Sequence, residues 1–254
     1  MDGVVGHESL VDSDHVTFGT HLRYWLASQL SFGVGRRLSR SQLLGRRSWA
    51  QEGEDLALAR LLEPRGSGFY VDVGAHDPLR FSNTALFYGD GWCGLNIEPD
   101  PEGARRLRSY RRRDVTVNIG VGAAKSEMTF FRFGESALNT FSAPLAKRRI
   151  EVGSSKLLEQ ISVPVDRLEN ILARELGAGQ RIDFMTVDAE GLDLDVLMSN
   201  DWSRFRPDFV LAEALELDLV SLAEDPLCSY MQTNNYKPVA KIANSVIFAS
   251  RDSR

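Results

Sequence analysis

The segment that most constrains the fold is 68–77, with the sequence Gly-Phe-Tyr-Val-Asp-Val-Gly-Ala-His-Asp. An apolar run with the length of a buried strand contains Asp72 near its end and breaks into a turn at Gly74. A related pattern follows at 93–98, where Cys-Gly-Leu-Asn-Ile leads to Glu98. Two such strands are typical of α/β sheets that bind a nucleoside, because the glycine turn admits the ligand and the second acid accepts hydrogen bonds from ribose hydroxyls.

Strands and helices alternate along the rest of the chain. Strands are predicted at 69–73, 94–97, 115–119, 127–133, 160–165, 182–187 and 208–212, and helices at 51–62, 82–88, from 100, 166–175, 192–200 and within 215–234. This alternation favours a parallel sheet with helices on both faces. The last strands, near 236–242 and 245–250, are too close for a crossover helix and are expected to form an antiparallel pair. Five parallel strands and a terminal hairpin are the arrangement of a class I methyltransferase.

The first 47 residues differ from this pattern. Apolar residues recur at helical spacing over 20–32, and a basic, serine-rich connector follows at 35–47. Two interpretations stay open, a helix packed on the outside of the domain, or a lid or an arm to a second subunit of a homodimer. We therefore divide the chain into an N-terminal helical extension, 1–47, and a domain, 48–254.

Composition excludes several classes of protein. The chain has 254 residues, 43% of them hydrophobic, and a net charge of −5. One large core is expected, and no global field favours nucleic acid or an anionic membrane. The acidic N-terminus is unlike a signal peptide, and no apolar run has membrane-spanning length. Cys93 and Cys228 form no metal-ligand spacing. We expect a cytoplasmic protein that binds no nucleic acid and does not insert into a membrane.

The turn after the first strand selects among nucleoside ligands. A dinucleotide site uses Gly-x-Gly-x-x-Gly, whereas Gly74 is followed here by Ala-His-Asp-Pro. A carboxylate at this turn would repel a pyrophosphate and suits a ligand with a sulfonium or ammonium group, such as S-adenosylmethionine. Two other functions compete with methyl transfer, and the first is a nicotinamide-dependent oxidoreductase, which the missing glycines argue against. The second alternative is a non-catalytic nucleoside-binding module.

Several blocks resemble the FkbM-type methyltransferases. They are Ser-Trp-Ala-Gln-Glu-Gly-Glu-Asp at 48–55, the segment 68–78, Phe-Ser-Asn-Thr at 81–84, Gly-Trp-Cys-Gly-Leu-Asn-Ile-Glu-Pro at 91–99 and Ile-Asp-Phe-Met-Thr-Val-Asp-Ala-Glu-Gly at 182–191. The resemblance covers roughly 48–250. It implies a class I, Rossmann-like fold with a seven-stranded sheet, S-adenosylmethionine as donor, and O-methylation of a sugar or polyketide hydroxyl, a small-molecule acceptor.

The resemblance also implies residues for the donor. Asp72 and Gly74 are expected at the methionine and ribose side, and Glu98 at the ribose hydroxyls. Asn118 lies where the adenine edge is usually met, with a buried amide that ties two loops as its alternative. Gln51 is expected as a helper at the methionine carboxylate, or else as part of a charged first helical turn, and Ser82 as a helper at the turn, or else as a plain N-cap. His76 is expected at the donor site in a loop-fixing role, and Asp188 is also counted among the donor-binding residues.

Three acids follow the fourth and fifth strands of the predicted parallel sheet. Asp188 and Glu190 end one strand and Glu213 ends the next, so they are expected to project toward the acceptor. One mechanism makes Asp188 or Glu213 the general base for an attacking hydroxyl. The other places Mg²⁺ on Asp188, Glu213 and Asn244, and the high pKa of a sugar hydroxyl favours it. The alternatives are a helix N-cap for Asp188 and a surface carboxylate for Glu213. Grouped carboxylates are a poor choice for a passive site.

Two further polar or basic segments are candidates for a functional role. The polar stretch 134–150 is predicted as a long functional loop, with Asn139, Thr140 and Phe141 near the acceptor. The arginines at 105–113 are interpreted as a solvated basic helix end.

Overall fold

The computed structural model describes residues 47–62, 66–214, 217, 219–220, 222 and 224–252. The predictions for the N-terminal extension, as a helix, lid or dimer arm, lie outside these residues. Ser48–Arg254 is one compact unit. Within the described ranges, no helix has the length and apolar composition needed to span a bilayer.

The main sheet has seven strands in the order β3-β2-β1-β7-β8-β10-β9. Their bounds are β1 Phe69–Val73, β2 Cys93–Ile97, β3 Val115–Val117, β7 Phe184–Val187, β8 Phe209–Glu213, β9 Tyr236–Ile242 and β10 Ser245–Ser250. The five strands from β3 to β8 run parallel, and β10 is antiparallel to both β8 and β9. The predicted parallel sheet with an antiparallel terminal pair is confirmed, and the hairpin folds back so that β10 lies next to β8.

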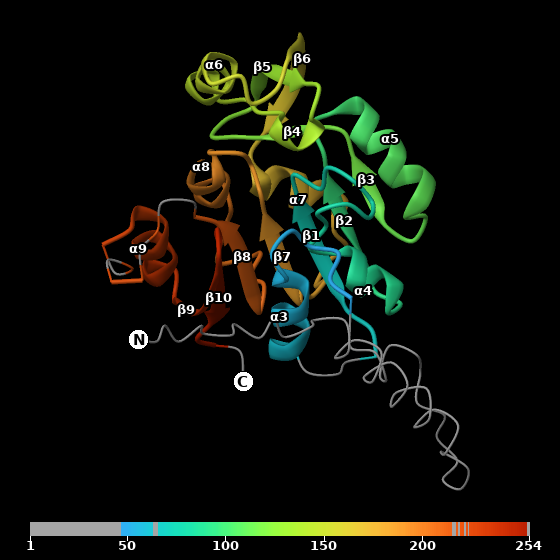
Figure 1. Ribbon diagram of the computed structural model, residues 1–254. Helices are drawn as coiled ribbons and strands as arrows, with labels where there is room; N and C mark the ends of the chain where they lie inside the picture. The colour runs from blue at the N-terminus through green and yellow to red at the C-terminus, as the bar shows by residue number, and fades with distance from the viewer. Residues whose placement is uncertain are drawn as a thin grey trace, which may run out of the picture. The chain divides into compact units, whose positions relative to one another are not determined.

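Alternation along the strands gives the sheet two apolar faces. Val71 and Val73 pack on one face, with α7 (Leu168–Glu175), α8 (Asp193–Met198) and α9 (Pro226–Thr233). Tyr70 packs on the other, with α3 (Glu54–Leu61) and α4 (Ala85–Gly89). Since β1 is central and buried on both faces, its carboxyl end and the turn at Gly74 have a fixed position between two layers of helices (Figure 1).

Helix α5 (Pro101–Tyr110) begins as its sequence predicts. The carboxylate of Asp100 accepts a hydrogen bond from the backbone N–H of Glu102 at 3.2 Å, and Pro101 occupies the first turn. A cap of this kind stabilises a helix by about 1 kcal/mol. Ala104 and Leu107 are fully buried, so the helix is anchored beside β2 and β3 through one apolar face.

A second sheet of three strands lies beyond the carboxyl edge of the main one (Figure 1). It consists of β4 (Gly120–Val121), β6 (Leu157–Asp166) and β5 (Ser126–Phe133), with the short 3-10 turn η1 (Ser136–Leu138) and α6 (Ala143–Glu151) after β5. The predicted loop over 134–150 is therefore wrong over much of its length. Ser142 caps α6 by accepting from the N–H of Leu145 at 3.3 Å, and Pro144 follows in the first turn.

Several boundaries also differ from the predicted ones. α3 begins at Glu54 and α4 at Ala85, each three residues later than predicted, because irregular turns precede them. The third strand ends at Val117, where the chain leaves the main sheet and joins the second as β4. α7 has no capping box, since Asp166 accepts from Arg167 N and Asn170 Nδ2 instead.

Candidate active site

A cavity opens at the carboxyl edge of the sheet, below the second sheet. It encloses about 830 Å³ of space, part of it open to solvent. Its walls come from the ends of β1, β2 and β7 and from the second sheet with its connections. Of the residues predicted to bind the donor, the cavity brings together five: Gln51, Gly74, His76, Glu98 and Asp188. We refer to it as the first cavity.

Gly74 sits at a position that no side chain would fit. Its φ is +81°, and its N–H donates to the carbonyl of Ile97 at 2.9 Å. A Cβ added there would lie 1.9 Å from the backbone oxygen of Asp188. The glycine is therefore required for the close approach of the β1 and β7 ends, which together form the floor of the cavity.

Glu98 is held rigidly at the end of β2. One carboxylate oxygen accepts from the N–H of His76 at 2.6 Å and the other from the N–H of Asp100 at 2.8 Å, and the residue is 4% exposed. Burial raises the pKa of Glu98 to about 7. Each carboxylate oxygen accepts one backbone donor and keeps a lone pair for a ligand hydroxyl.

His76 fixes the turn, as predicted for its side chain. Its φ of +52° is rare for a residue with a side chain, and its Nε2 lies 2.9 Å from Ser136 Oγ in the second sheet. Burial lowers the pKa of His76, so the ring is neutral at pH 7. The imidazole thus joins the turn after β1 to the segment that covers the cavity.

Asp72 and Ser82 do not reach the first cavity. Alternation along β1 turns Asp72 to the same face as Tyr70, where its Oδ2 accepts from Thr84 Oγ1 at 2.5 Å. Burial raises the pKa of Asp72 to about 6. Ser82 Oγ accepts from the N–H of Ala85 at 3.2 Å and so holds the turn that leads into α4, but the N-cap of this helix is Thr84 and not Ser82.

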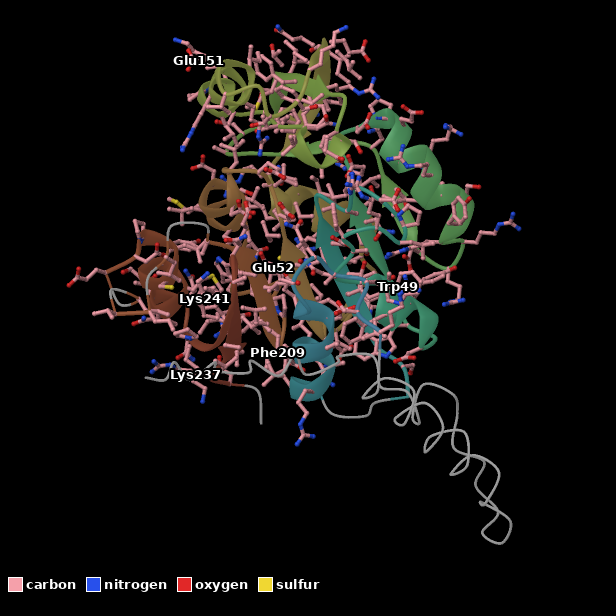
Figure 2. The ribbon with its side chains drawn as sticks, in the orientation of Figure 1. Trp49, Glu52, Glu151, Phe209, Lys237 and Lys241 are labelled. Atoms are coloured by element: carbon pink, nitrogen blue, oxygen red, sulfur yellow. The ribbon has the colours of Figure 1, made fainter. Side chains whose placement is uncertain are left out.

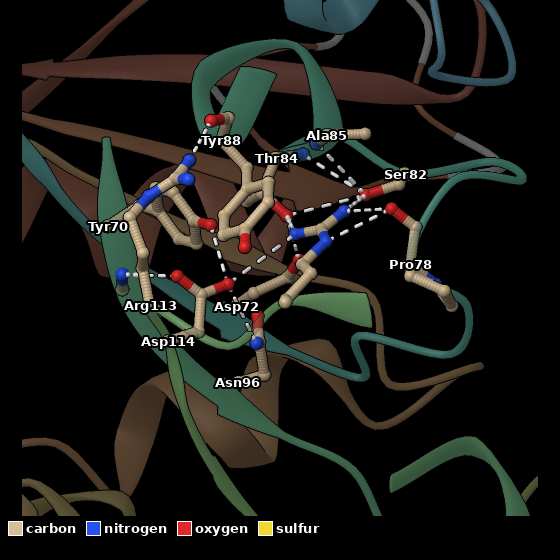
Figure 3. A network of polar contacts seen from close by, with 12 residues as sticks. Tyr70, Asp72, Pro78, Ser82, Thr84, Ala85, Tyr88, Asn96, Arg113 and Asp114 are labelled. Atoms are coloured by element: carbon tan, nitrogen blue, oxygen red, sulfur yellow. Dashed lines mark hydrogen bonds and ion pairs between the residues drawn. The ribbon is translucent and has the colours of Figure 1, made fainter. Parts of the chain in front are cut away.

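Arg111 corrects the interpretation of the basic stretch. It is 1% exposed and lies beneath the Pro78–Thr84 segment instead of in solvent. Its guanidinium donates to Pro78 O at 2.6 Å, to Ser82 Oγ at 2.7 Å and to Thr84 Oγ1 at 2.6 Å. Figure 3 shows these acceptors converging above Asp72. The sequence carries no signal for this, because arginines in a run after a helix are usually solvated.

Asn118 also lies outside the cavity wall. Its Nδ2 donates to the carbonyls of Glu98 at 2.8 Å and Pro99 at 2.9 Å. The alternative of a buried amide that ties two loops describes this geometry. The wall beside Glu98 is apolar and comes from Ile97, Pro99, Ile119, Val121 and Phe130.

The segment after β5 covers the first cavity. Asn139, Thr140 and Phe141 all contribute to its wall, so they face the cavity that contains Glu98. Phe141 packs against Phe130 with ring centroids 4.7 Å apart, and Asn139 accepts from the N–H of Phe133 at 2.7 Å. The second sheet thus forms the roof of the cavity.

A second, more polar cavity adjoins the first and shares Gln51, Phe81 and Asp188 with it. The predicted residues Glu213 and Asn244 line this second cavity. Asn244 donates through its backbone N–H and its Nδ2 to the two oxygens of Glu52, both at 2.7 Å. Figure 2 shows Glu52 above Phe209, which begins β8, so this cavity too lies toward the carboxyl ends of the strands.

The acids at the junction of the two cavities repel one another. Asp188 is accessible from the cavities yet surrounded by protein, and burial followed by the charge of Glu213 raises its pKa well above the usual value. Burial and Asp193 raise the pKa of Glu213 to about 8. Glu190, at φ +50°, differs because it forms an ion pair with Arg149.

The predicted magnesium ligands do not form a convincing metal site. Among the residues that the structure describes, no three His, Cys, Asp or Glu side chains are grouped so that they could hold a metal ion. The side chain of Asn244 is directed at Glu52 by its Nδ2 hydrogen bond. Among the described residues, Asp188 and Glu213 therefore have no third protein ligand of this kind, so a Mg²⁺ ion held by them would need water and substrate oxygens to complete its coordination.

The strand order, with β10 inserted antiparallel beside β8, and a glycine turn with an acid on the next strand define a class I S-adenosylmethionine-dependent methyltransferase. The model of the FkbM methyltransferase domain matches residues 72–237, well over half of the chain. The protein belongs to this family.

Solved structures of methyltransferases match the chain at low identity and with low TM-scores. An O-methyltransferase from Bacillus cereus in complex with SAH is 10% identical, covers 94% of this chain and 92% of its own, and has a TM-score of 0.41. The 1,6-didemethyltoxoflavin-N1-methyltransferase of Burkholderia thailandensis is 14% identical, with coverages of 96% and 91% and a TM-score of 0.37. The sequence matches no curated protein.

Proposed function

We propose that the protein transfers the methyl group of S-adenosylmethionine to a hydroxyl of a small, neutral or cationic polyhydroxylated molecule such as a carbohydrate. The observation that carries this proposal is the pair of adjoining cavities with the carboxylate of Asp188 at their junction. Methyl transfer needs the donor and the acceptor in line at one point, and this junction offers a proton acceptor there.

The first cavity is assigned to the donor. Glu98 accepts hydrogen bonds from the ribose hydroxyls, and the apolar wall of Ile97, Pro99 and Ile119 packs against adenine. Gly74 gives the methionine part close access to the backbone, and Gln51 lies near its carboxylate. Asp72 and Ser82 support this site indirectly, by holding the turn through Thr84 and Arg111.

Asp188 is assigned as the general base because it borders both cavities. Its raised pKa makes the ionised form a better proton acceptor near neutral pH than an ordinary aspartate. Glu213 borders only the second cavity, so it binds the acceptor and helps to set the charge of Asp188. Glu190 holds Arg149 and Thr140 in the roof and has a positioning role.

The test is a product assay with labelled donor across a panel of neutral sugars and polyols. Asp188→Asn is expected to lower the rate by about 100-fold or more while the donor still binds, because only proton removal is lost. Asp195→Asn, an exposed acid on α8, is the matched control and keeps wild-type activity. Equal activity of the two variants would contradict the assignment of the base.

Magnesium assistance is the second candidate for activating the hydroxyl, since Asp188 and Glu213 are oxygen ligands. Exhaustive chelation distinguishes the two mechanisms. General-base catalysis predicts an unchanged rate after chelation, whereas loss of activity that added Mg²⁺ restores would favour the metal. The cytoplasmic location and a homodimer remain predictions from the sequence.

A further inference from the structure

We infer that the natural acceptor carries a protonated amine beside the hydroxyl that is methylated, as amino sugars and aminocyclitols do, and that this amine binds at Glu213. The inference rests on the proposed function, because it assigns the second cavity to the acceptor. It names the chemical class of the acceptor from the hydrogen-bonding groups that line this cavity.

The side-chain donors of the second cavity are largely occupied by protein acceptors. Asn244 Nδ2 donates to Glu52, and Ser245 Oγ donates to Glu54 at 3.2 Å. Asn83 Nδ2 donates to Thr186 Oγ1 at 3.1 Å. The amide of Gln51 remains able to donate. A ligand therefore meets few donors here.

Several hydrogen-bond acceptors of the second cavity, in contrast, have no protein donor among the described residues. The Oδ1 atom of Asn83 is buried and has no hydrogen-bond partner within the described ranges. No described residue donates a hydrogen bond to the carboxylate of Asp188 or Glu213 either, and the repulsion between the two is offset only in part, by the charge of Arg149 near Glu213. A ligand that donates hydrogen bonds would satisfy these oxygens in place of solvent.

The charge of the cavity selects among ligands that donate. Four carboxylates line it, those of Glu52, Glu54, Asp188 and Glu213, and none of its described residues is Lys, Arg or His. The sulfonium of the donor can offset Asp188, which borders the first cavity, but Glu52, Glu54 and Glu213 border only the second. A cationic acceptor offsets the charge of Glu52 and Glu54 and favours the ionised form of Glu213, whose pKa is raised to about 8, whereas a phosphate or carboxylate would be repelled.

The experiment compares three sugars of one ring geometry, the methyl glycosides of glucosamine, glucose and glucuronate. Their binding to the full-length protein saturated with S-adenosylhomocysteine is measured by ligand-observed NMR, at a pH where the amine is protonated. Glucosamine is expected to bind about tenfold more tightly than glucose, the effect of one charge-assisted hydrogen bond, and glucuronate most weakly.

Two variants connect the result to the site. Glu213→Gln is expected to reduce glucosamine binding at least fivefold while glucose binding stays the same. Glu151→Gln, at an exposed acid on α6 far from Glu52 in Figure 2, is the control and changes neither. Equal affinities for the three sugars, preference for glucuronate, or no glucosamine binding to the loaded protein would overturn the inference. Failure of S-adenosylhomocysteine to bind would instead contradict the proposed function.

Discussion

At the scale of single residues, the site depends on positions where the surrounding structure determines which residue type fits or which pKa its side chain has. Gly74 has a positive φ and lies against the backbone of Asp188, so its backbone geometry and its lack of a side chain are both needed. Glu98 is buried, Asp188 is surrounded by protein but accessible from the cavities, and both have pKa values above the usual range. Such combinations of strain and raised pKa are typical of functional sites.

Gly74→Ala is therefore expected to destabilise the protein by roughly 3 kcal/mol or more, from the strained φ and the clash with Asp188 together. Gly91→Ala is the matched control, since its φ is +97° but a Cβ there meets nothing within 4 Å. It should cost only about 1–2 kcal/mol. Urea denaturation of the two variants measures the difference, and equal losses would contradict the required close approach of β1 and β7.

Glu213 is expected to reduce stability at high pH. Its pKa in the folded protein, about 8, lies above that of a solvated glutamate, so stability is lost as pH rises through the range up to about 8. Glu213→Gln removes this loss. In the ligand-free protein the variant should melt at least about 2 °C above wild type at pH 8. The two proteins should converge at pH 4, where Glu213 is protonated in both states, and a variant less stable than wild type at pH 8 would refute the argument.

At the scale of elements, the Pro78–Thr84 segment connects the buried network to both cavities. The guanidinium of Arg111 holds the segment by donating to Pro78, Ser82 and Thr84. Phe81, at the centre of the segment with a φ of +55°, borders the two cavities. The shape of the junction near Asp188 therefore depends on contacts made by a residue outside both cavities.

Arg111→Lys keeps the charge but cannot reach three acceptors at once. We expect a loss of roughly 2–4 kcal/mol in unfolding free energy, as for other broken buried ionic networks, and weaker donor binding at a temperature where the variant is folded. Arg112→Lys, at an exposed neighbour, is the control for both measurements. If the Arg111 variant unfolds and binds like the Arg112 variant, the network does not position the segment.

The order of elements in the main sheet could be predicted from the sequence because each buried strand is a short apolar run bounded by turn residues. The second sheet and its connections were harder to predict from the sequence. The sequence predicts a loop where α6 forms, because the segment is polar and its Ser-Ala-Pro helix start is a weak signal. The packing of α6 also depends on partners that are distant in the chain, such as Glu190, which pairs with Arg149.

The candidate site could be predicted only in part, because strand-end motifs specify some of its residues and tertiary contacts specify the others. Gly74, Glu98 and Asp188 follow from motifs at strand ends, which fix both position and direction. Asp72 belongs to the same motif, but alternation turns it to the opposite face, and a motif alone does not specify the side-chain partner. Arg111 depends on tertiary contacts without any local signal, whereas the long polar stretch after the second-sheet strand indicated the roof residues Asn139, Thr140 and Phe141.

At the scale of the whole described domain, the first cavity is formed by two sheets together. The main sheet supplies the carboxyl edge with Gly74, Glu98 and Asp188, and the second sheet closes over it with Phe130 and Phe141 (Figure 1). This enclosure gives the acids their raised pKa values. It also predicts that a donor-shaped ligand joins the two sheets and stabilises the domain.

Calorimetric titration of S-adenosylhomocysteine into wild type, Glu98→Ala and Glu102→Ala tests the assignment of the first cavity most directly. Glu98 is buried at the cavity wall, whereas Glu102 is exposed on the adjoining helix and serves as the control. We predict binding to wild type and to the Glu102 variant with equal affinity, and at least about tenfold weaker binding to the Glu98 variant, because the ribose loses its acceptor. No binding to wild type, or equal binding to all three proteins, would contradict the account.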